Sequence, residues 1–225
     1  MVEANSTVTS AAVVQDGAEA GTSDTLAELF KPENYSKTTS SNINEMYDKL
    51  SAADYEQFLV KINFTEPFYI RDYVVKGSAD GGVDIAKDAE ILDFGCGTGI
   101  VGYLIKDHGY TNITGLDASD NFINIIKEKG IYKGGEALFL GQGVDQFPDK
   151  YKNAYDVVTG TGVFLPKHIP STAFYDAHAA LKVGGLFVLT IRENLWETGQ
   201  ELGYKDKIDE LVAAGKMEII KTETF

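Results

Sequence analysis

The sequence is poor in several features that would indicate particular classes of protein. Its 225 residues include a single cysteine, Cys96, which excludes an internal disulfide framework. Lys and Arg number 20 against 34 Asp and Glu, and the resulting net charge of −14 disfavours a nucleic-acid substrate. No apolar run approaches the ~20 residues that cross a membrane. We therefore expect no nucleic-acid partner and no membrane partner, and with 44% hydrophobic residues the chain can fill the core of one α/β domain.

The first forty residues contain almost no basic residues, since the first Lys or Arg is Lys31. The only apolar cluster, at residues 11–14, is too short for a secretory signal, and a transit peptide would be rich in Arg. We expect residues 1–40 to be a mostly disordered acidic and Ser/Thr-rich tail, with at most a helical turn at 25–30. Residues 41–225 then form the folded domain of a cytoplasmic protein.

Residues 91–105 read ILDFGCGTGIVGYLI, an apolar run that ends at Asp93, a loop of three glycines, and a segment with helical spacing. Strand, glycine loop and helix open a nucleotide-binding βαβ unit. The glycines Gly95, Gly97 and Gly99 let the backbone approach a ligand where a Cβ would clash. Residues 97–102 also satisfy the dinucleotide pattern G-x-G-x-x-G, which is weak evidence alone.

Two carboxylates discriminate between the possible cofactors. The Asp93 carboxylate would repel an anionic pyrophosphate, but it would attract the ammonium and sulfonium groups of S-adenosylmethionine. Asp117 ends the next apolar strand, twenty residues after Gly97, where a carboxylate can accept hydrogen bonds from both ribose hydroxyls. The sequence thus predicts S-adenosylmethionine. An NAD(P)-dependent reductase stays as an alternative, although no tyrosine is followed by lysine four residues later.

Strands and helices are expected to alternate along the rest of the chain. Strands are predicted at 89–94, 112–117, 137–140, 155–159 and 185–191, with a sixth beginning at 217–220. Helices are predicted at 42–50, 52–62, 65–75, 100–108, 119–129, 171–181 and 198–214, with Thr65, Ser119 and Ser171 as N-caps. This order indicates an α/β protein with a doubly wound parallel sheet and ligands at the carboxyl ends of the strands.

Residues 93–99 match the first motif of class I S-adenosylmethionine-dependent methyltransferases, and residues 115–119 match the second. More narrowly, the chain from about Asn42 onward is similar to the Williams–Beuren-region methyltransferase-like (methyltransferase-like protein 27) family. Tyr47-Asp48 and Asp54-Tyr55 resemble the helix that lids the cofactor in such enzymes, and residues 160–170 and 182–185 resemble family loops. The resemblance implies a Rossmann-like fold, a mostly parallel sheet with helices on both faces, and methyltransferase activity.

Two departures from the class are visible. Many members carry an acid after the third strand that binds the adenine amino group, whereas this chain has Gln142, whose amide oxygen can accept the same hydrogen bond without charge. The class also closes its sheet with an antiparallel pair of strands, whereas this sequence stops at Phe225. We therefore expect the final strand to be missing.

The expected site lies at the ends of these strands. We expect the adenine to pack against Ala118 and Phe122. His168 is the candidate general base, or alternatively a structural histidine. Arg192 is the candidate for holding an anionic acceptor, or alternatively forms a salt bridge. No metal site is expected. The expected cofactor-binding residues are Tyr47, Tyr55, Asp93, Gly95, Cys96, Gly97, Gly99, Asp117, Ala118, Phe122, Gln142, Gly143 and Thr159.

The expected function is methyl transfer from S-adenosylmethionine to an oxygen, nitrogen or sulfur atom of a small molecule by in-line displacement. The N/D-P-P-Y/F/W tetrapeptide used for base amino groups and Gln amides is absent after the fourth strand, where residues 159–162 read TGTG. Two alternatives stay open: a protein methyltransferase, and a catalytically silent protein that binds the cofactor. We expect a monomer or homodimer.

Overall fold

A computed structural model describes residues 23–77, 83–197 and 201–225. Its centre is a five-stranded parallel sheet with the strand order β3-β2-β1-β4-β5. The strands are β1 (Ile91–Phe94), β2 (Ile113–Asp117), β3 (Gly134–Ala137), β4 (Tyr155–Gly160) and β5 (Leu181–Leu189). The prediction of an α/β, doubly wound, Rossmann-like parallel sheet is confirmed.

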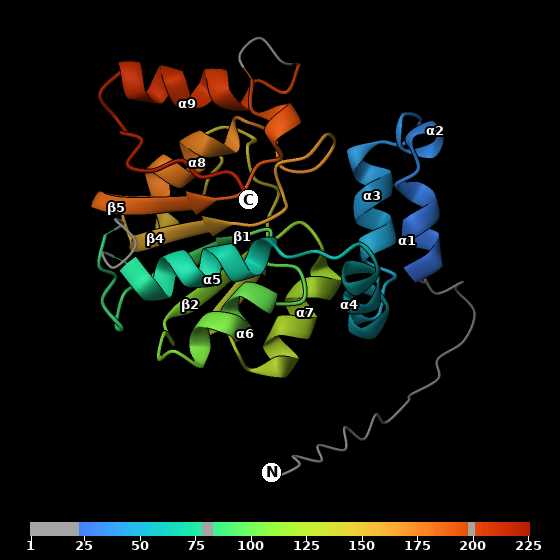
Figure 1. The fold of residues 1–225 in the computed structure, drawn as a ribbon. Helices are drawn as coiled ribbons and strands as arrows, with labels where there is room; N and C mark the ends of the chain where they lie inside the picture. Colours follow the sequence, from blue (N-terminus) through green and yellow to red (C-terminus); the bar gives the residue numbers. More distant parts are fainter. Residues whose placement is uncertain (1–22, 78–82, 198–200) are drawn as a thin grey trace.

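Helices cover both faces of this sheet, and further helices lie at one end of it (Figure 1). One face is covered by α5, α6 and α7 and the other by α8 and α9, while α1–α4 stand beyond the ends of β4 and β5 at which the strand arrows point. The helices are α1 (Ser23–Leu29), α2 (Pro32–Tyr35), α3 (Ser40–Tyr47), α4 (Ala52–Lys61), α5 (Glu66–Lys76), α6 (Ile100–Lys106), α7 (Asp120–Lys129), α8 (Ala173–Ala180) and α9 (Tyr204–Ala213).

The central strand β1 is buried along its whole length, because it pairs with β2 and β4 and is covered on both faces. Ile91 faces a core formed with α5, α6 and α7, whereas Leu92 and Phe94 belong to a core on the α8 face. A strand that is covered on both faces is dominated by apolar residues, and Asp93 is the one polar residue of β1, which is why the sequence located this strand. The carboxyl ends of β1, β2 and β4 therefore meet at one edge, beside α1–α4.

The third strand was wrongly placed. The apolar run 137–140 was predicted, but β3 occupies residues 134–137 and starts with two glycines. A Cβ on Gly135 would lie 2.8 Å from the Ile126 side chain and 3.1 Å from the Gly115 carbonyl oxygen. This edge strand thus needs a glycine at position 135 for the close packing of α7, and hydropathy alone does not reveal that need.

The fifth strand also differs from its prediction at 185–191, since it runs from Leu181 to Leu189 and carries a register shift opposite residues 155–157. The predicted strand at 217–220 is not formed. Residues 217–225 make no regular secondary structure, and Ile219 and Ile220 are about half exposed. A strand needs a hydrogen-bonded neighbour, and the Phe225 ring instead stacks on Tyr69 of α5, 3.6 Å away.

The folded part begins earlier than residue 41. Residues 23–35 form α1 and α2, and Leu26 is fully buried against Leu50, Phe58 and Leu59. The expected disordered tail is therefore wrong for residues 23–40, because the apolar side chains of α1 complete a small core with α3 and α4. Residues 1–22 of that expected tail lie outside the described residues.

Helix boundaries were predicted with mixed success. Ser119 caps α7 as expected and accepts a hydrogen bond from the Phe122 N–H. Thr65 precedes α5 without a side-chain cap bond, and α8 begins after Thr172 rather than Ser171. The Thr172 hydroxyl donates to the Gly141 carbonyl instead, 2.8 Å away. The predicted helix 198–214 is observed as α9 from Tyr204, and residues 198–200 lie outside the described part. Within the described residues, no helix combines the length and hydropathy that crossing a bilayer requires.

Candidate active site

The loop between β1 and α6 places three glycines in the left-handed region, with φ of +63° for Gly95, +51° for Gly97 and +88° for Gly99. This backbone favours glycine, as the sequence motif predicts. The Gly97 N–H donates to Asp117 at the end of β2, 2.9 Å away, and the other Asp117 oxygen accepts from the Ser119 N–H. The second-strand carboxylate therefore lies directly beside the glycine loop.

Asp93 is almost completely buried, with 1% of its surface exposed, and both of its oxygens accept hydrogen bonds. Tyr132 donates to one oxygen at 2.6 Å, and Thr159 donates to the other at 2.7 Å. Burial raises the pKa of Asp93 to about 6, and the two hydroxyl donors partly offset this rise. The only hydroxyl hydrogen of Thr159 is thus committed to Asp93, so Thr159 supports the site from behind.

Tyr132 is a residue that the sequence analysis missed. It follows α7 and carries no motif, yet its ring packs against the glycine loop and its oxygen also accepts the Gly102 N–H. A Cβ on Gly102 would lie 2.5 Å from that ring, and one on Gly99 would lie 3.0 Å from it. The glycines that complete the dinucleotide pattern therefore make room for an internal tyrosine. The close approach of this ring explains Gly102, and at Gly99 it adds to the requirement of the left-handed backbone.

A small cavity of about 30 Å³ lies between the glycine loop, α4 and the start of α5. Asp93, Thr98 and Thr161 are among its lining residues. The hydroxyl oxygens of Thr98 and Thr161 are buried and have no hydrogen-bond partner within the described residues. Buried hydroxyls are normally satisfied, so two unsatisfied ones beside a carboxylate indicate a site for a polar group.

Aromatic rings from the N-terminal helices cover the loop. Tyr47 of α3 and Tyr55 of α4 pack edge to face at 5.8 Å, and both contact the ring of Phe122, which is 2% exposed. The Tyr55 ring lies 3.6 Å from where a Cβ of Gly97 would stand. Three residues named from the sequence are therefore brought together over the loop.

Hydrogen bonds fix α3 above the end of β2. The Ser119 hydroxyl donates to Asp48 at 2.6 Å, and the Asn121 amide donates to the carbonyls of Tyr47 and Leu50. Asp48 is the acid of the first Tyr-Asp pair, so this pair connects the covering helices to the Asp117 loop. Burial raises the pKa of Asp117 to about 6, against the backbone N–H groups that lower it.

The residues expected to contact the adenine do not form one buried cluster. Ala118 follows Asp117 and is partly buried, whereas Gln142 and Gly143 are exposed on the loop after β3. That loop is anchored from below by Asp176 of α8, which accepts the Gly141 N–H at 2.6 Å. Cys96 is buried under the loop against Gly115, and burial raises the pKa of its thiol. Its position is that of a small packing residue.

His168 lies in the loop after β4 among aromatic rings from the N-terminal helices. Its Nε2 is 2.9 Å from the Tyr47 hydroxyl, and its Nδ1 is 3.0 Å from the Pro166 carbonyl oxygen. The ring stacks on Phe30 at 6.0 Å. Burial lowers the pKa of His168, the hydrogen bond to the Pro166 carbonyl partly offsets this, and nearby Arg192 lowers the pKa further. The imidazole is therefore neutral at neutral pH.

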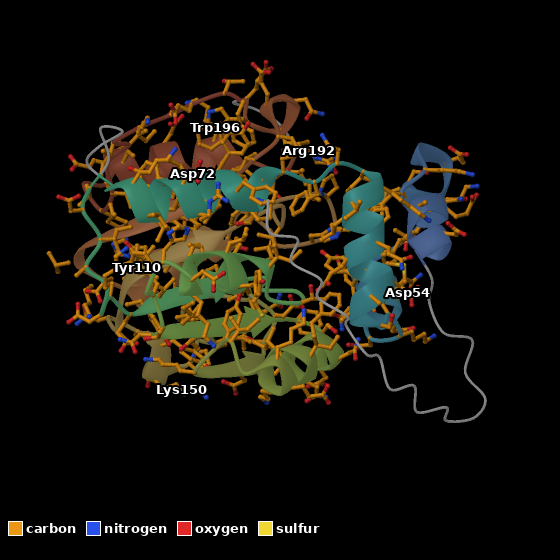
Figure 2. The ribbon with its side chains drawn as sticks, turned by 60° about the horizontal axis from the view of Figure 1, so that its bottom comes forward. Asp54, Asp72, Tyr110, Lys150, Arg192 and Trp196 are labelled. Atoms are coloured by element: carbon orange, nitrogen blue, oxygen red, sulfur yellow. The ribbon has the colours of Figure 1, made fainter. Side chains whose placement is uncertain are left out.

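Arg192 follows β5 and is exposed, on the same segment as Trp196 (Figure 2). No carboxylate of the described residues forms an ion pair with it, so the salt bridge considered as an alternative is not formed there. Its charge acts on His168 and lowers the pKa of Tyr35 as well, although burial raises that pKa to about 12 overall. Arg192 therefore lies near His168 and Tyr35, and its side chain is exposed to solvent.

Comparison with known proteins finds a family described as "Methyltransferase domain", which matches residues 69–215, well over half of the chain. Methyltransferase-like protein 27 of Homo sapiens is 27% identical over 172 residues, 76% of this chain and 66% of the human protein. A ubiquinone biosynthesis O-methyltransferase of Shewanella pealeana is 30% identical over 107 residues, 47% of this chain and 45% of its own length. A tRNA U34 carboxymethyltransferase of Cellvibrio japonicus is 32% identical over 119 residues, 51% of this chain and 35% of its own length.

A solved S-adenosylmethionine-dependent methyltransferase from Thiobacillus denitrificans, in complex with S-adenosyl-L-homocysteine, is 18% identical with a TM-score of 0.39. It covers 56% of this chain and 48% of that protein. The matched region thus spans less than two thirds of each curated relative. The family match, the strand order and the glycine loop agree, and the chain belongs to the methyltransferase domain family of class I S-adenosylmethionine-dependent proteins.

Proposed function

We propose that this protein transfers the methyl group of S-adenosylmethionine to an oxygen, nitrogen or sulfur atom of a small molecule. One observation carries the proposal: the buried hydroxyls of Thr98 and Thr161 lack partners and line the same cavity as Asp93. A polar recess beside a glycine loop is suited to the charged amino-acid end of this cofactor. No internal partner competes for these two hydroxyls within the described residues.

The residues present suit the rest of the cofactor as well. Each Asp117 oxygen accepts one backbone N–H and keeps a second lone pair, which leaves an acceptor for each ribose hydroxyl. Phe122 and Ala118 supply apolar surface for the adenine, and Gln142 supplies an amide at the loop after β3. When bound, the cofactor supplies a methyl group on a sulfonium, which is its own leaving group.

The protein's own part in such a reaction is to align the acceptor and to exclude water. Tyr47, Tyr55 and Phe122 form the cover that would do so. The cavity of about 30 Å³ has room for a few water-sized groups but not for a nucleoside. The nucleoside would bind outside this cavity beside Phe122, on which Tyr47 and Tyr55 pack, so we expect α3 and α4 to move away when the cofactor enters and to close the site on their return.

The acceptor side of the proposal rests on Arg192 and on overall charge. An arginine without a carboxylate partner can hold a carboxylate by two parallel hydrogen bonds. A net charge of −14 opposes an RNA acceptor, which the name of the tRNA-modifying relative raises as an alternative. A cytoplasmic location and a monomer or homodimer complete the proposal.

A second candidate is a protein that binds the cofactor without turnover. It is favoured by the tight packing of Phe30, Tyr35 and Tyr47 around His168, on the side where an acceptor would enter. In that case the covering helices would never admit an acceptor. The two candidates predict the same cofactor affinity and differ only in transfer.

Calorimetry with S-adenosylmethionine and S-adenosylhomocysteine tests the part that both candidates share. No heat with either ligand, from protein that is folded by circular dichroism, would contradict both. Transfer is then tested with cofactor carrying a labelled methyl group and a panel of small carboxylates, amines, thiols and phenols. Label that enters only protein or RNA of a cell extract would replace the small-molecule acceptor, and no label anywhere would leave the silent protein.

A further inference from the structure

The hydrogen bonds around His168 determine which of its nitrogens carries the hydrogen. Nδ1 is 3.0 Å from the carbonyl oxygen of Pro166, which can only accept. In a neutral imidazole one nitrogen donates and the other accepts, so Nδ1 is the donor. The lone pair of His168 therefore lies on Nε2.

That lone pair points at Tyr47. The Tyr47 hydroxyl is 2.9 Å from Nε2 and, with Nε2 as acceptor, donates its hydrogen there. A free histidine side chain prefers the opposite tautomer, with its hydrogen on Nε2. The arrangement around His168 thus selects the less common form and aims its basic nitrogen at a phenol of the covering helix.

The loop that carries His168 is built around Tyr35 of α2. The Tyr35 hydroxyl donates to the Pro166 carbonyl and lies 3.2 Å from Nδ1, while the Lys167 ammonium donates to the Tyr35 carbonyl. Lys167 has φ of +63°, a conformation that non-glycine residues adopt rarely and at a cost. Three consecutive loop residues thus contact one tyrosine, which holds the Pro166 carbonyl where Nδ1 needs it.

We propose that Tyr47 and His168 form a proton relay for the acceptor, with Tyr35 and the Pro166 carbonyl as the groups that set its direction. As the acceptor oxygen bonds to the methyl carbon, its proton passes to the Tyr47 oxygen, while the Tyr47 proton passes to His168 Nε2. The electron pair of the broken sulfur–carbon bond stays on sulfur. The positive charge that leaves the sulfonium thus ends on the imidazolium, and the products balance.

Tyr47 acts in this relay as a neutral phenol. Burial raises its pKa well above the ordinary value, and Tyr55 and Asp117 raise it further, so a resting phenolate is disfavoured. The Tyr47 ring also packs against Phe122, the ring expected beside the adenine, so Tyr47 lies on the side of the expected cofactor. Tyr35 is a positioning residue, since it acts only through the loop and His168. The relay rests on the proposed function, because it needs a methyl acceptor that carries a proton.

Nitrogen-15 NMR tests the tautomer directly, because the chain has only three histidines. A His108→Gln/His178→Gln background leaves His168 alone, and its two ring nitrogens are distinguished at pH 8 with S-adenosylhomocysteine added. We expect the Nδ1–H form. Tyr47→Phe should shift the population toward Nε2–H, whereas Tyr55→Phe, which alters a neighbouring ring without a bond to His168, should not.

Tyr35→Phe should weaken the Nδ1–H preference less than Tyr47→Phe does, because the Pro166 carbonyl remains. Two results would overturn the relay even if calorimetry confirms that the cofactor binds. One is an Nε2–H tautomer of His168 in the background that keeps Tyr47, and the other is a spectrum that Tyr47→Phe leaves unchanged. Conversely, if the expected tautomer is found but calorimetry detects no heat of cofactor binding, the proposed function fails while the hydrogen bonds around His168 are confirmed.

Kinetics test the relay's role in transfer. With labelled cofactor and the panel of phenols and thiols at pH 9, Tyr47→Phe should lower kcat for a phenol on the order of 10²-fold with little change in KM, as expected for lost acid–base catalysis. Transfer to a thiol that is already ionised should change less than 3-fold, because no proton has to leave. Equal losses for both acceptors would show that Tyr47 only packs.

Discussion

The Tyr132 hydroxyl donates a hydrogen bond of 2.6 Å to Asp93, the buried acid near the carboxyl end of the central strand. The same oxygen accepts the Gly102 N–H, so one tyrosine links β1 to the first turn of α6. Through this contact the glycine loop is supported from beneath by a residue outside every recognised motif. The rigidity of the candidate site therefore depends on a side chain that binds no ligand.

Removal of this hydroxyl should destabilise the protein. Tyr132→Phe leaves one oxygen of the Asp93 carboxylate and the Gly102 N–H without their hydrogen-bond partner, while Thr159 still donates to the other oxygen, and such losses cost about 1–3 kcal/mol. Urea unfolding followed by circular dichroism measures the change. Tyr103→Phe is the matched control, because the Tyr103 side chain is 58% exposed, and it should change stability by less than about 0.5 kcal/mol. Equal stability of the two variants would remove Tyr132 from this role.

Asp93 should make stability fall as the pH rises from about 4 to about 7. Its pKa is about 6 in the folded protein against an ordinary value of 3.8, so the folded state holds the proton more tightly. This difference in pKa contributes on the order of 2–3 kcal/mol to the free energy of unfolding. The contribution is fully present below the pKa of the unfolded state and is lost as the pH rises through 6.

Asp93→Asn isolates this effect. Burial lowers the pKa of His168, which changes stability in the opposite direction, so the informative quantity is the difference between the two proteins. Unfolding free energies at pH 4.5 and 7.5 should decline less for Asp93→Asn. The interpretation fails if both proteins lose stability equally over this range.

Thr161→Val should separate stability from cofactor binding. Because the Thr161 hydroxyl is buried without a partner in the described residues, its replacement by a methyl group should stabilise the free protein by about 1 kcal/mol. Cofactor affinity, measured by calorimetry, should fall about 2- to 13-fold, corresponding to one ordinary hydrogen bond of about 0.5–1.5 kcal/mol.

Thr190→Val is the matched control for that change. The Thr190 hydroxyl donates to Glu66 and accepts the Gly162 N–H, so its loss should destabilise the protein by about 1–3 kcal/mol. If Thr161→Val also destabilises the free protein, the Thr161 hydroxyl is already hydrogen-bonded without the cofactor, and its proposed role in cofactor binding fails.

Asp117→Ala should weaken binding of S-adenosylmethionine and S-adenosylhomocysteine by roughly 1–3 kcal/mol, because ribose hydroxyls would lose a charged acceptor. Loss of the bond to the Gly97 N–H adds to this by loosening the loop. Calorimetry gives the affinities, and Asp120→Ala, an exposed acid in the first turn of α7, serves as control. An unchanged affinity would exclude Asp117 from ribose recognition.

Arg192→Ala should raise KM for a carboxylate-bearing acceptor about 10-fold or more while cofactor affinity stays the same. Arg192→Lys should restore this only in part, because an ammonium cannot make two parallel hydrogen bonds. Initial rates with the labelled cofactor measure both variants. A rise in KM that is equal for neutral and anionic acceptors would argue against recognition of charge.

The sequence by itself determined the fold class, the glycine loop and the two carboxylates, because each is specified locally. Strand β1 is an apolar run, the left-handed loop positions require glycine, and Ser119 caps α7 with its own side chain. Signals of this kind are contained in a few adjacent residues. They can therefore be recognised in the sequence without knowing which residues pack against them.

Tertiary structure decided what depends on distant neighbours. Tyr132 meets Asp93 across 39 positions, and His168 meets Tyr47 across 121. Gly135 of β3 is explained by the approach of α7, and α1 packs on the domain through Leu26, which is buried with Leu50, Phe58 and Leu59. A burial or hydrogen-bond partner that lies far along the chain leaves no local pattern, since the free energy comes from the contact and not from the residue's own backbone preference.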